Sequence, residues 1–368
     1  MSVSIVLGCG FGDEGKGNVT NWLCKKDPEN SLVVRFNGGH QAGHTVIHEG
    51  KRHVFSSFGS GTLQKVPTFW SKYCTIYPTG FLNEWATLES IGVTPKMFID
   101  PLCPITTPFD IQENRLGNLS TGHGSCGVGF GHTIMRHETL EHSYRIFAMD
   151  LLTPWILQEK LRQIAKRFGS ALNMEATISV FMDDCKDFVA KVEFLPEERV
   201  LLRHRDANII FEGAQGILLD RQHGIFPHVT RSNTTRKNAV EIIERNGLGS
   251  YPPSVYYVSR CYQTRHGAGP LQLGGFPLNL VNNEQETNVT NPWQGEFRYA
   301  PFSMDLIDYA VDVDRQYMGN VPCSSRLVVT CMDQVGETLN CIDSNGDVYV
   351  NGIEQFKESL PIRTIFVD

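Results

Sequence analysis

The sequence lacks the features that would mark a membrane, secreted or nucleic-acid-binding protein. It has no run of about 18 apolar residues that could span a membrane. Residues 1–7 have neither the basic segment nor the long apolar segment of a signal peptide. The formal net charge of -7 leaves no excess of Lys and Arg to neutralise nucleic-acid phosphates. We therefore expect a cytoplasmic protein, in the host cytoplasm if its source is viral, that binds neither membrane nor nucleic acid.

The ten cysteines form no C-x-x-C pair, and their spacing matches neither a zinc site nor a small disulfide scaffold. Reduced thiols in a cytoplasmic protein are the simpler interpretation. The 368 residues are 41% hydrophobic and 20% charged, which is typical of a globular protein with a large core. No internal repeat or heptad pattern interrupts them. We expect one domain over residues 1–368, with long active-site loops.

Short apolar runs alternate with helical patterns along the chain. The runs with strand character are Ser2–Leu7, Leu32–Phe36, Asn208–Phe211, Val255–Ser259 and Leu327–Thr330. The runs with helical spacing are Lys16–Cys24, Phe81–Ile91, Asp150–Phe168 and a helix from Ser303 to Val313. This alternation predicts an α/β fold with a mostly parallel central sheet and helices on both faces. From Asn340 onward we expect only a small β appendage without readable chemistry, and we assign Trp22 and Trp155 to the core.

The segment Gly10–Lys16 fits the phosphate-loop pattern G-x-x-x-x-G-K between a strand and a helix. Glycines let backbone N–H groups converge on phosphate oxygens, while the helix N-terminus and Lys16 add positive charge. The alternative is a glycine-rich turn without a ligand. Gly17 stands where a Ser or Thr would normally hold Mg²⁺. Asp13 is therefore the candidate metal ligand, general base, or both.

Two further glycine-rich clusters contain polar side chains. The segment Asn37–Thr45 carries His40 and His44, and a protonated histidine beside a phosphoryl group could stabilise a leaving oxygen. The segment Phe211–Gly216 includes Gln215, which offers both a donor and an acceptor to a purine edge. The hydroxyl-rich segment Val229–Thr235 suits phosphate or ribose. Each cluster alone could equally be a structural turn.

Together these segments resemble the adenylosuccinate synthetase family. The resemblance rests on Gly12–Gly17, Gly38–Thr45, Phe211–Gly216, Val229–Thr230 with Ser232–Thr235, and Thr264–Arg265 with Gly267–Pro270. It extends from the start of the sequence to about residue 335, and it implies a P-loop-like phosphate site in a fold of that family. By resemblance, the chain would be a homodimeric ligase whose substrates are a purine nucleoside monophosphate, L-aspartate and GTP, with Mg²⁺ as cofactor and ATP the less favoured donor.

The resemblance also implies roles for individual residues. Asp13 would remove the N1 proton of the purine, and His44 would stabilise the leaving diphosphate. The catalytic residues would be Asp13, Lys16, His44 and Gln215, and Mg²⁺ would bind Asp13 and the carbonyl of Gly43. The triphosphate would contact Gly12, Asp13, Glu14, Gly15, Lys16, Gly17, Asn18, Gly43, His44, Thr45 and Asp333. The purine monophosphate would contact Asp13, Asn37, Gln41, Ser120, Thr121, Arg136, Gln215 and Thr230, with Arg136 crossing from a partner subunit.

Departures from the family bear on the substrate. The arginine-rich loop that would grip aspartate is absent, and we expect Thr290, Gln294 and Arg298 to replace it, with Arg298 as the obvious carboxylate clamp. Such changes resemble the phage branch of the family, which acts on dGMP in diaminopurine DNA precursor synthesis. Asp13 and Asp333 instead favour a GTP-using form, because the Asp333 carboxylate can pair with guanine. We therefore expect dGMP as substrate, with IMP as the alternative. A GTP-binding regulatory protein is the alternative of another class.

Overall fold

The computed structural model describes residues 1–121, 125–169, 173–281, 293, 295–319, 322–360 and 362–367. Its central feature is a nine-stranded sheet with the strand order β16-β13-β9-β1-β8-β2-β5-β6-β7, in which every pairing is parallel. The predicted parallel sheet is confirmed. The strands are β1 (Val3–Gly8), β2 (Ser31–Arg35), β5 (Thr68–Trp70), β6 (Met97–Ile99), β7 (Glu193–Phe194), β8 (Asn208–Gly216), β9 (Ser254–Arg260), β13 (Ser324–Thr330) and β16 (Thr364–Phe366).

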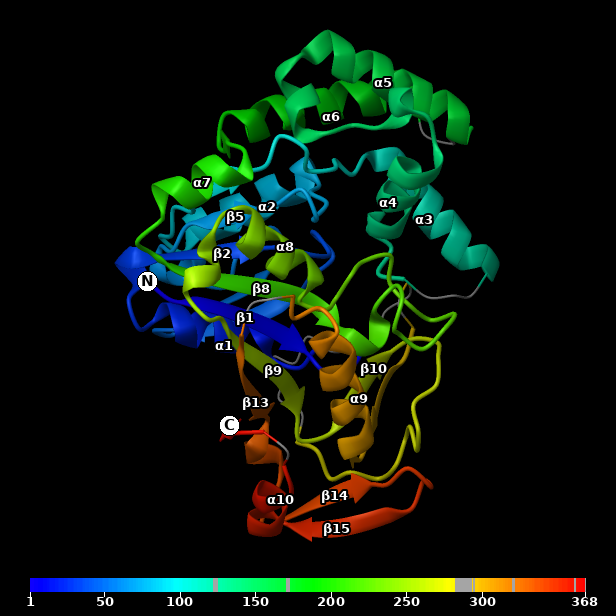
Figure 1. Cartoon of the computed structure of the whole chain (residues 1–368). Coiled ribbons are helices and arrows are strands. Elements are labelled where there is room, and N and C mark those ends of the chain that lie inside the picture. The colour runs from blue at the N-terminus through cyan, green and yellow to red at the C-terminus, as the bar shows by residue number, and fades with distance from the viewer. Residues whose placement is uncertain are drawn as a thin grey trace.

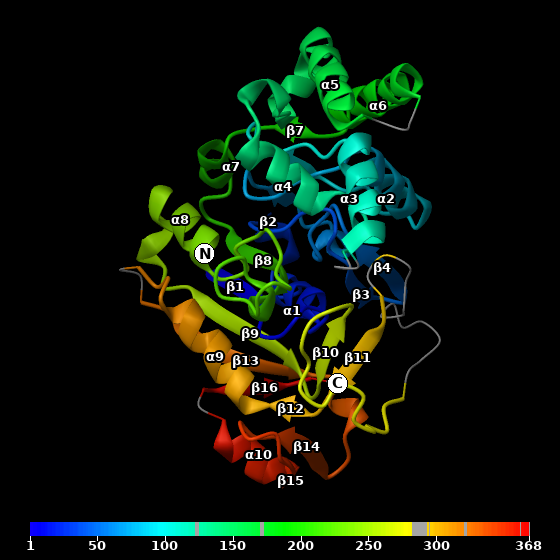
Figure 2. The same cartoon turned by 90° about the vertical axis from the view of Figure 1, so that its right-hand side faces the viewer.

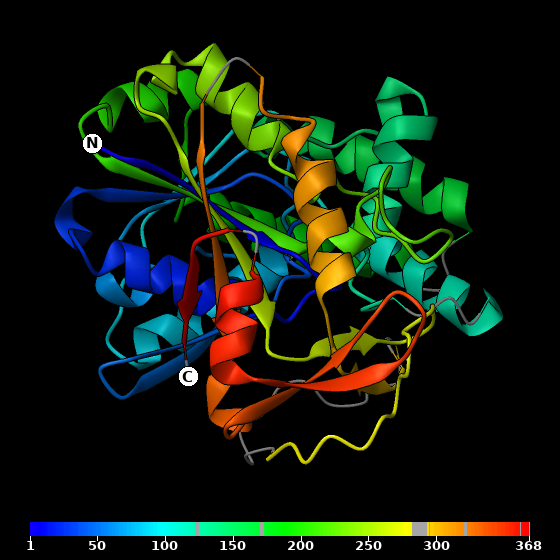
Figure 3. The ribbon, with the colours of Figure 1, turned by 60° about the horizontal axis from the view of Figure 1, so that its bottom comes forward.

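Helices cover both faces of the sheet, as predicted. On β1, Ile5 packs into the same core as α8 (Lys237–Arg245) and α9 (Met304–Arg315), whereas Val6 packs with α1 (Lys16–Cys24). Figure 3 shows α1 in blue on one side of the strands and α9 in orange on the other. Strands buried on both faces need no polar alternation, which explains why they read as continuous apolar runs.

A second apolar core lies beyond the β5–β6 part of the sheet. There α2 (Pro78–Ser90), α5 (Pro154–Phe168) and α6 (Met174–Val189) pack around Trp70 and Phe81. In Figure 1, α5 and α6 lie together at one end of the molecule. Nearby, α3 (Pro108–Thr121) packs against α4 (Phe130–Thr139), and α7 (Glu197–Arg203) leads into β8. No helix within the described ranges is long and apolar enough to cross a membrane.

Three small sheets accompany the central one. They are the pair β3 (His44–His48) and β4 (Lys51–Phe55), the pair β10 (Gln263–His266) and β11 (Phe297–Ala300), and a set of β12 (Phe302–Ser303), β14 (Thr338–Ile342) and β15 (Val348–Gly352). Figure 2 places β10 and β11 near the lower end of β9. The β10–β11 pair therefore adds backbone beside the carboxyl end of β9.

The C-terminal segment differs from the β appendage that we expected from Asn340 onward. After β14 and β15 the chain forms α10 (Ile353–Ser359) and then β16, which pairs in parallel with Leu327–Val329 of β13 at the edge of the central sheet. The prediction was wrong because β16 is only three residues long, too short for a pattern to be detected. This segment is therefore part of the main fold.

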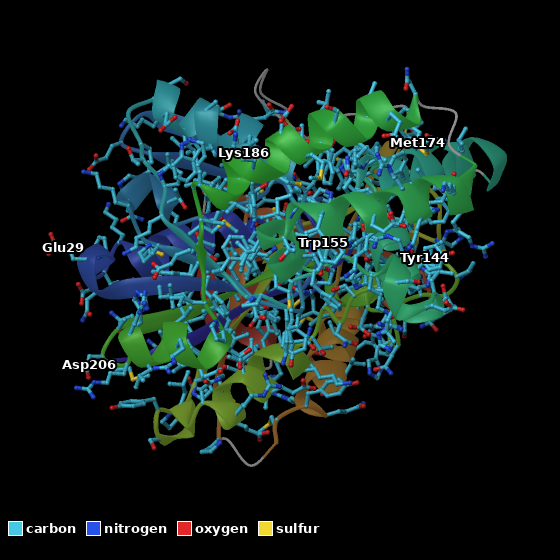
Figure 4. The ribbon with its side chains drawn as sticks, turned by 90° about the horizontal axis from the view of Figure 1, so that it is seen from above. Glu29, Tyr144, Trp155, Met174, Lys186 and Asp206 are labelled. Atoms are coloured by element: carbon cyan, nitrogen blue, oxygen red, sulfur yellow. The ribbon has the colours of Figure 1, made fainter. Side chains whose placement is uncertain are left out.

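The predicted helix boundaries are most accurate where the sequence contains a clear helix-start signal, such as a glycine-rich turn or a capping serine. The helix Lys16–Cys24 is confirmed in full, and Ser303 caps α9 through its Oγ, 3.4 Å from the N–H of Leu306. The helix predicted from Asp150 begins instead at Pro154, because residues Ala148–Leu152 form a separate 3-10 helix. Trp155 at the start of α5 is 73% exposed, so its assignment to the core was wrong. Figure 4 shows it on the outer side of that helix.

Candidate functional site

A cavity of about 580 Å³ opens where β1 ends and α1 begins. Of the predicted phosphate loop, Phe11 to Lys16 line it and Gly10 does not, and the predicted nucleotide contacts Gly17 and Asn18 also line it. Gly12 and Gly15 have φ of 101° and 93°, a left-handed conformation that glycine adopts without steric cost. The turn brings the start of α1 to the cavity, and the first N–H groups of a helix have no acceptor within it. This end of the cavity suits an anion.

The Glu14 carboxylate lies inside the phosphate loop. Its Oε1 accepts hydrogen bonds from the N–H groups of Gly10 (3.0 Å) and Gly12 (2.8 Å), and its Oε2 pairs with Lys16 Nζ. A Cβ on Gly216 would lie 2.5 Å from that Oε1, so glycine leaves the space that the carboxylate needs. In this conformation Glu14 therefore occupies the N–H groups of Gly10 and Gly12, and their binding to phosphate stays a prediction. In this conformation an anion would meet the start of α1 instead.

Gly17 is a packing requirement rather than a missing Mg²⁺ ligand. A Cβ at this position would come within 2.8 Å of His44 Cβ and 3.0 Å of Ser60 Oγ. Such contacts are closer than packed atoms allow, so a Ser or Thr would displace its neighbours. The close approach of α1 to β3 fixes His44 at the cavity wall beside the loop.

His44 is oriented by a buried carboxylate. Its Nδ1 lies 2.8 Å from Oε1 of Glu212, and Ser60 donates to the same carboxylate through its hydroxyl and its N–H (3.0 Å). Burial lowers the pKa of His44, with Glu212 opposing that effect. Burial alone would raise the pKa of Glu212, but His44, Arg35 and Ser60 lower it overall. Glu212 therefore holds Nδ1 and leaves Nε2 for a ligand.

Asp13 is held by residues of β9 and β10. Its φ is 64°, Arg260 Nε donates to its carbonyl oxygen (2.6 Å), and His266 Nε2 lies 3.1 Å from its Oδ2. The Asp13 side chain is 28% exposed at the cavity. Burial would raise its pKa, but the hydrogen bond and charge of His266, with the charges of Arg260 and Lys16, lower it overall. Asp13 is thus ionised at neutral pH, as a metal ligand or a general base requires.

Two glutamine amides line the cavity with unused polar atoms. Within the described residues, Gln41 Oε1 and Nε2 and Gln215 Oε1 are buried without a hydrogen-bond partner. Gln215 also has a left-handed φ of 61°, which turns the chain at the end of β8. A buried polar group without a partner costs about 1 to 3 kcal/mol. These atoms are therefore suited to a polar ligand.

Part of the cavity wall is apolar. Trp22 of α1, Cys331, and Ile365, Phe366 and Val367 at β16 contribute to this part. Trp22 is 45% exposed, so its assignment to the core was wrong as well. The C-terminal segment, to which we assigned no chemistry, also forms part of the site. A flat purine base would fit such a wall, because aromatic and aliphatic side chains stack on its faces.

Arg136, which we expected to cross to a partner subunit, makes its contacts within its own chain in this structure. Its side chain is fully buried, and it donates to both oxygens of Asp110 (2.9 and 2.8 Å) and to the carbonyls of Ile105 and Tyr144. In this structure those donors are committed within its own chain, and the phosphate contact stays a prediction. Sequence could not reveal this, since Asp110 precedes Arg136 by a loop and a helix.

Asn37 is likewise buried rather than open to the purine. Its Nδ2 donates to the carbonyl of Ala214 (3.1 Å), and its Oδ1 accepts from the N–H of the same residue (2.7 Å). These contacts are structural, and the substrate contact of Asn37 stays a prediction. These two hydrogen bonds connect the end of β2 to the residue preceding Gln215, and so they position the turn at Gln215.

The other predicted residues are distributed as follows. Gln41, Gly43, His44, Thr45 and Gln215 line the cavity, but Thr230, Arg298 and Asp333 do not. Asp333 is exposed on the 3-10 helix Met332–Gln334, and its Oδ2 accepts from Gln334 Nε2 (2.7 Å). It therefore does not face the cavity as we expected, because the left-handed Cys331 turns the chain outward. The side chains of Ser120 and Thr121, and residues Thr290 and Gln294, lie outside the described part.

Arg298 is placed on β11 opposite Arg265 of β10. Its Nη2 donates to the carbonyls of Gly267 (2.5 Å) and Gly269 (2.8 Å). Burial and the nearby charge of Arg298 lower the pKa of Arg265 to about 10. Two arginines held side by side form a cationic position beside the cavity, which suits a carboxylate.

The residues proposed to hold Mg²⁺ have the right chemistry. The Asp13 carboxylate and the Gly43 backbone both line the cavity, and hard oxygen donors are what Mg²⁺ prefers. Among the described residues no cluster of three His, Cys, Asp or Glu side chains could form a site by itself. A metal here would need additional oxygens from phosphate or water, which is usual for Mg²⁺ bound with a nucleotide.

A sequence profile described as adenylosuccinate synthetase matches residues 5–286. The chain belongs to the adenylosuccinate synthetase family. Among curated relatives of this family it is similar to the adenylosuccinate synthetase of Hahella chejuensis, with 30% identity over 299 residues. That alignment covers 76% of this chain but 65% of the relative, so the chain spans less than two thirds of the relative's length.

Two solved structures resemble the fold. One is a fully ligated adenylosuccinate synthetase from Plasmodium falciparum, with a TM-score of 0.70 and 17% identity, covering 95% of this chain and 83% of that one. The other is the succinoaminodeoxyadenylate synthetase of cyanophage S-2L, bound to dGMP and to dATP as an energy donor. Its TM-score is 0.62 and its identity 17%, with 91% of this chain and 85% of that one covered. Both confirm the predicted fold.

Some residues of the site were not singled out by the sequence. Glu212 was quoted only as part of a glycine-rich segment, and Arg260 and His266 were given no role, although all three contact His44 or Asp13. His266 directly follows the matched Thr264–Arg265 pair, so its position next to a motif was the signal available. Nothing in the sequence pointed to β16.

Proposed function

We propose that the chain is a ligase that joins L-aspartate to C6 of a 6-oxopurine mononucleotide, driven by GTP. The observation that carries the proposal is the shared cavity of Asp13, Lys16 and His44, which combines an ionised carboxylate, a phosphate loop and an oriented imidazole. Membership of the adenylosuccinate synthetase family supports it. We further propose that residues 1–368 act as one domain.

The proposed chemistry has two steps. In the first, Asp13 accepts the N1 proton, which places enolate-like charge on O6. The O6 atom then attacks the γ-phosphorus, and the bond from that phosphorus to the bridging oxygen breaks to release GDP. In the second, the aspartate amine adds at C6 and loses a proton, and inorganic phosphate departs with O6. The first step is needed because an oxygen on C6 leaves poorly until it is phosphorylated.

Each proposed residue contributes a separate effect. Lys16 would give up its ion pair with Glu14 and bind the transferring phosphoryl group, whose negative charge it would neutralise. His44 would be protonated when the triphosphate is bound, because the negative charge of the phosphates raises its pKa, and its Nε2–H would then donate to the leaving diphosphate oxygen, where charge develops in the transition state. Gln215 would orient the purine edge. Mg²⁺, held by Asp13 and the Gly43 carbonyl, would neutralise phosphate charge.

For the purine substrate we propose dGMP, with IMP as the alternative. Guanine presents an exocyclic amine in addition to N1–H, whereas hypoxanthine presents only N1–H as a donor at that edge. Besides Asp13, the cavity offers the unpartnered acceptors Gln41 Oε1 and Gln215 Oε1. The additional amine donor of guanine would leave fewer of these acceptors unsatisfied, which favours guanine by about 1 to 3 kcal/mol per acceptor. The fold likeness to the cyanophage enzyme bound to dGMP is consistent with this choice.

For the other ligands the proposal follows the family. GTP is proposed as donor, with its base on the apolar part of the cavity wall beside Trp22 and Phe366, and ATP is the alternative. Arg298, with Thr290 and Gln294 outside the described part, is proposed to bind aspartate, and Ser120, Thr121 and Thr230 to lie near the monophosphate. We also propose a homodimer, without assigning Arg136 to its interface.

The decisive experiment is an assay of the purified protein with Mg²⁺, L-aspartate, GTP or ATP, and either dGMP or IMP. We expect aspartate-dependent release of phosphate and a new succino-purine product with dGMP. Turnover of IMP alone would replace dGMP by the alternative substrate. GTP hydrolysis that ignores both aspartate and purine monophosphate would instead indicate a regulatory GTP-binding protein and overturn the ligase proposal.

A further inference from the structure

His266 is the one side chain of β10 that touches the Asp13 carboxylate in the described residues. Its Nε2 lies 3.1 Å from Asp13 Oδ2, and the imidazole is 14% exposed. No hydrogen bond from the described residues reaches Asp13 Oδ1. One carboxylate oxygen is therefore fixed, and the other is open.

The placement of His266 follows from the pleat of β10. Side chains two apart on a strand point to the same face, so Thr264 and His266 share one face of β10 and Arg265 lies on the other. Thr264 Oγ1 donates to the carbonyl of Gly12 (3.3 Å), and His266 reaches the next residue of the loop. Arg265 instead lies over the ring of Phe11, 4.2 Å from its centroid. The strand thus contacts consecutive loop residues with alternate side chains.

The imidazole ring is supported from behind and has a defined tautomer. Phe297 of β11 is its cross-strand partner, with ring centroids 4.9 Å apart. His266 Nδ1 is buried without a hydrogen-bond partner among the described residues. A proton on Nδ1 would be a buried donor without an acceptor, so the proton resides on Nε2 and is donated to Asp13.

We propose that His266 is a positioning residue for Asp13: by holding Oδ2, it presents Oδ1 to the purine. This inference rests on the proposed role of Asp13 as the base at N1. Such a restraint is needed because Asp13 sits in a loop with a left-handed backbone and its side chain could otherwise rotate about χ1 and χ2. A misplacement of about 1 Å at a reacting group can cost on the order of 100-fold in rate.

The test compares His266→Leu with His266→Gln, because Gln restores an N–H donor of similar reach and Leu does not. We expect His266→Leu to lower kcat by about 100-fold with little change in the KM for GTP, and His266→Gln to recover most of that loss. Positional isotope exchange in GTP without aspartate should fall in parallel, since it reports phosphorylation of O6 alone. Equal activity of both variants, whether high or low, would overturn the proposal.

Controls separate positioning from folding and from the proposed function. His204→Leu removes a half-buried imidazole that packs on Phe98 far from the cavity, so it should leave kcat unchanged. If His266→Leu does not fold by thermal melting, His266→Met takes its place. The ¹⁵N-histidine spectrum of the wild type should contain an Nε2–H signal from His266, and this signal should shift in the spectrum of Asp13→Asn. Absence of that shift in an active ligase sinks this inference alone, whereas the shift in a protein without ligase activity sinks only the proposed function.

Discussion

Glu212 holds His44 from inside the sheet, with Oε1 of the carboxylate 2.8 Å from Nδ1 of the imidazole. Glu212 is fully buried in the middle of β8, where Ser60 supplies two further hydrogen bonds. A buried carboxylate with three donors does not rotate freely. The pair therefore presents Nε2 of His44 to the cavity in a fixed direction, as stabilisation of a leaving oxygen requires.

Replacing Glu212 by Gln should impair catalysis more than binding. The amide could not balance a positive charge on His44, so the imidazole would lose part of its ability to donate to the diphosphate oxygen. We expect kcat to fall by about 100- to 1,000-fold, the usual effect of losing one such donor. Steady-state kinetics would measure this, and KM for the purine monophosphate should change little. An unchanged kcat would remove the proposed role of the pair.

Replacing Asp13 by Ala should abolish ligation while the fold is retained. The side chain is partly exposed in a loop and contributes no core packing, so the melting temperature should change little. Activity should fall by about 100- to 10,000-fold, as expected for a lost general base. Product formation is followed by chromatography and folding by circular dichroism. Retained activity would mean that another group takes the N1 proton.

Gly17→Ser tests the packing interpretation of that position. A conventional phosphate loop would gain a Mg²⁺ ligand from this change, but here the new Cβ would lie 2.8 Å from His44 Cβ. We expect a loss of about 1 to 3 kcal/mol in the free energy of unfolding and lower activity at every Mg²⁺ concentration. Denaturant titration measures the first quantity. Tighter Mg²⁺ binding with full activity would contradict this view of Gly17.

The buried pair Asp110 and Arg136 should matter for stability rather than for substrate binding. Asp110→Asn would leave the Arg136 charge uncompensated in the core, at a cost of about 3 to 5 kcal/mol. Chemical denaturation at neutral pH would measure the loss. If Asp110→Asn kept its stability but bound the purine monophosphate more weakly, that result would support the predicted contact between Arg136 and the monophosphate.

The stabilisation that the Asp110–Arg136 pair contributes to the free energy of unfolding should depend on pH. Burial would raise the pKa of Asp110, but Arg136 and Thr107 lower it below its ordinary value of 3.8. The stabilisation is therefore complete above pH 3.8 and is lost as the pH falls through the lower pKa of the folded state. The stability difference between the wild type and Asp110→Asn should shrink in that acidic window and stay constant above it.

Trp22→Ala should weaken donor binding if the base stacks on the apolar part of the cavity wall. Loss of one base–aromatic contact is worth about 1 to 3 kcal/mol, so the KM for GTP should rise roughly tenfold or more. Trp155→Ala is the matched control, because Trp155 is 73% exposed and does not line the cavity. Equal effects of the two substitutions on the KM for GTP would contradict the placement of the donor base beside Trp22.

The sequence predicted what local pattern and motif chemistry determine. The apolar strands of the sheet centre and the helix Lys16–Cys24 follow from residues close together in the chain, and the phosphate-loop residues were found together at one cavity. By contrast, β5, β6 and β16 were missed, since three residues carry too little periodic signal. Their pairing depends on neighbours far away in sequence.

Two predicted site residues are paired within the chain for the same reason. Arg136 and Asn37 are polar residues near the expected motifs, and each is consumed by a buried partner, Asp110 or Ala214. Sequence spacing cannot show whether a donor is already occupied. The same limit hid His266, whose contact with Asp13 arises only when β10 lies beside the loop.

The pairing of β16 with β13 connects nucleotide binding to the order in which the chain is assembled. Residues 11–19 and 365–367 line one cavity although nearly the entire chain separates them. An edge strand of three residues has few hydrogen bonds of its own and opens readily. A nucleotide that contacts both regions would slow this opening, so amide hydrogen exchange in β16 should report occupancy at the phosphate loop. A chain whose synthesis has not reached β16 would present the loop without the completed cavity, which delays tight nucleotide binding until folding is nearly finished.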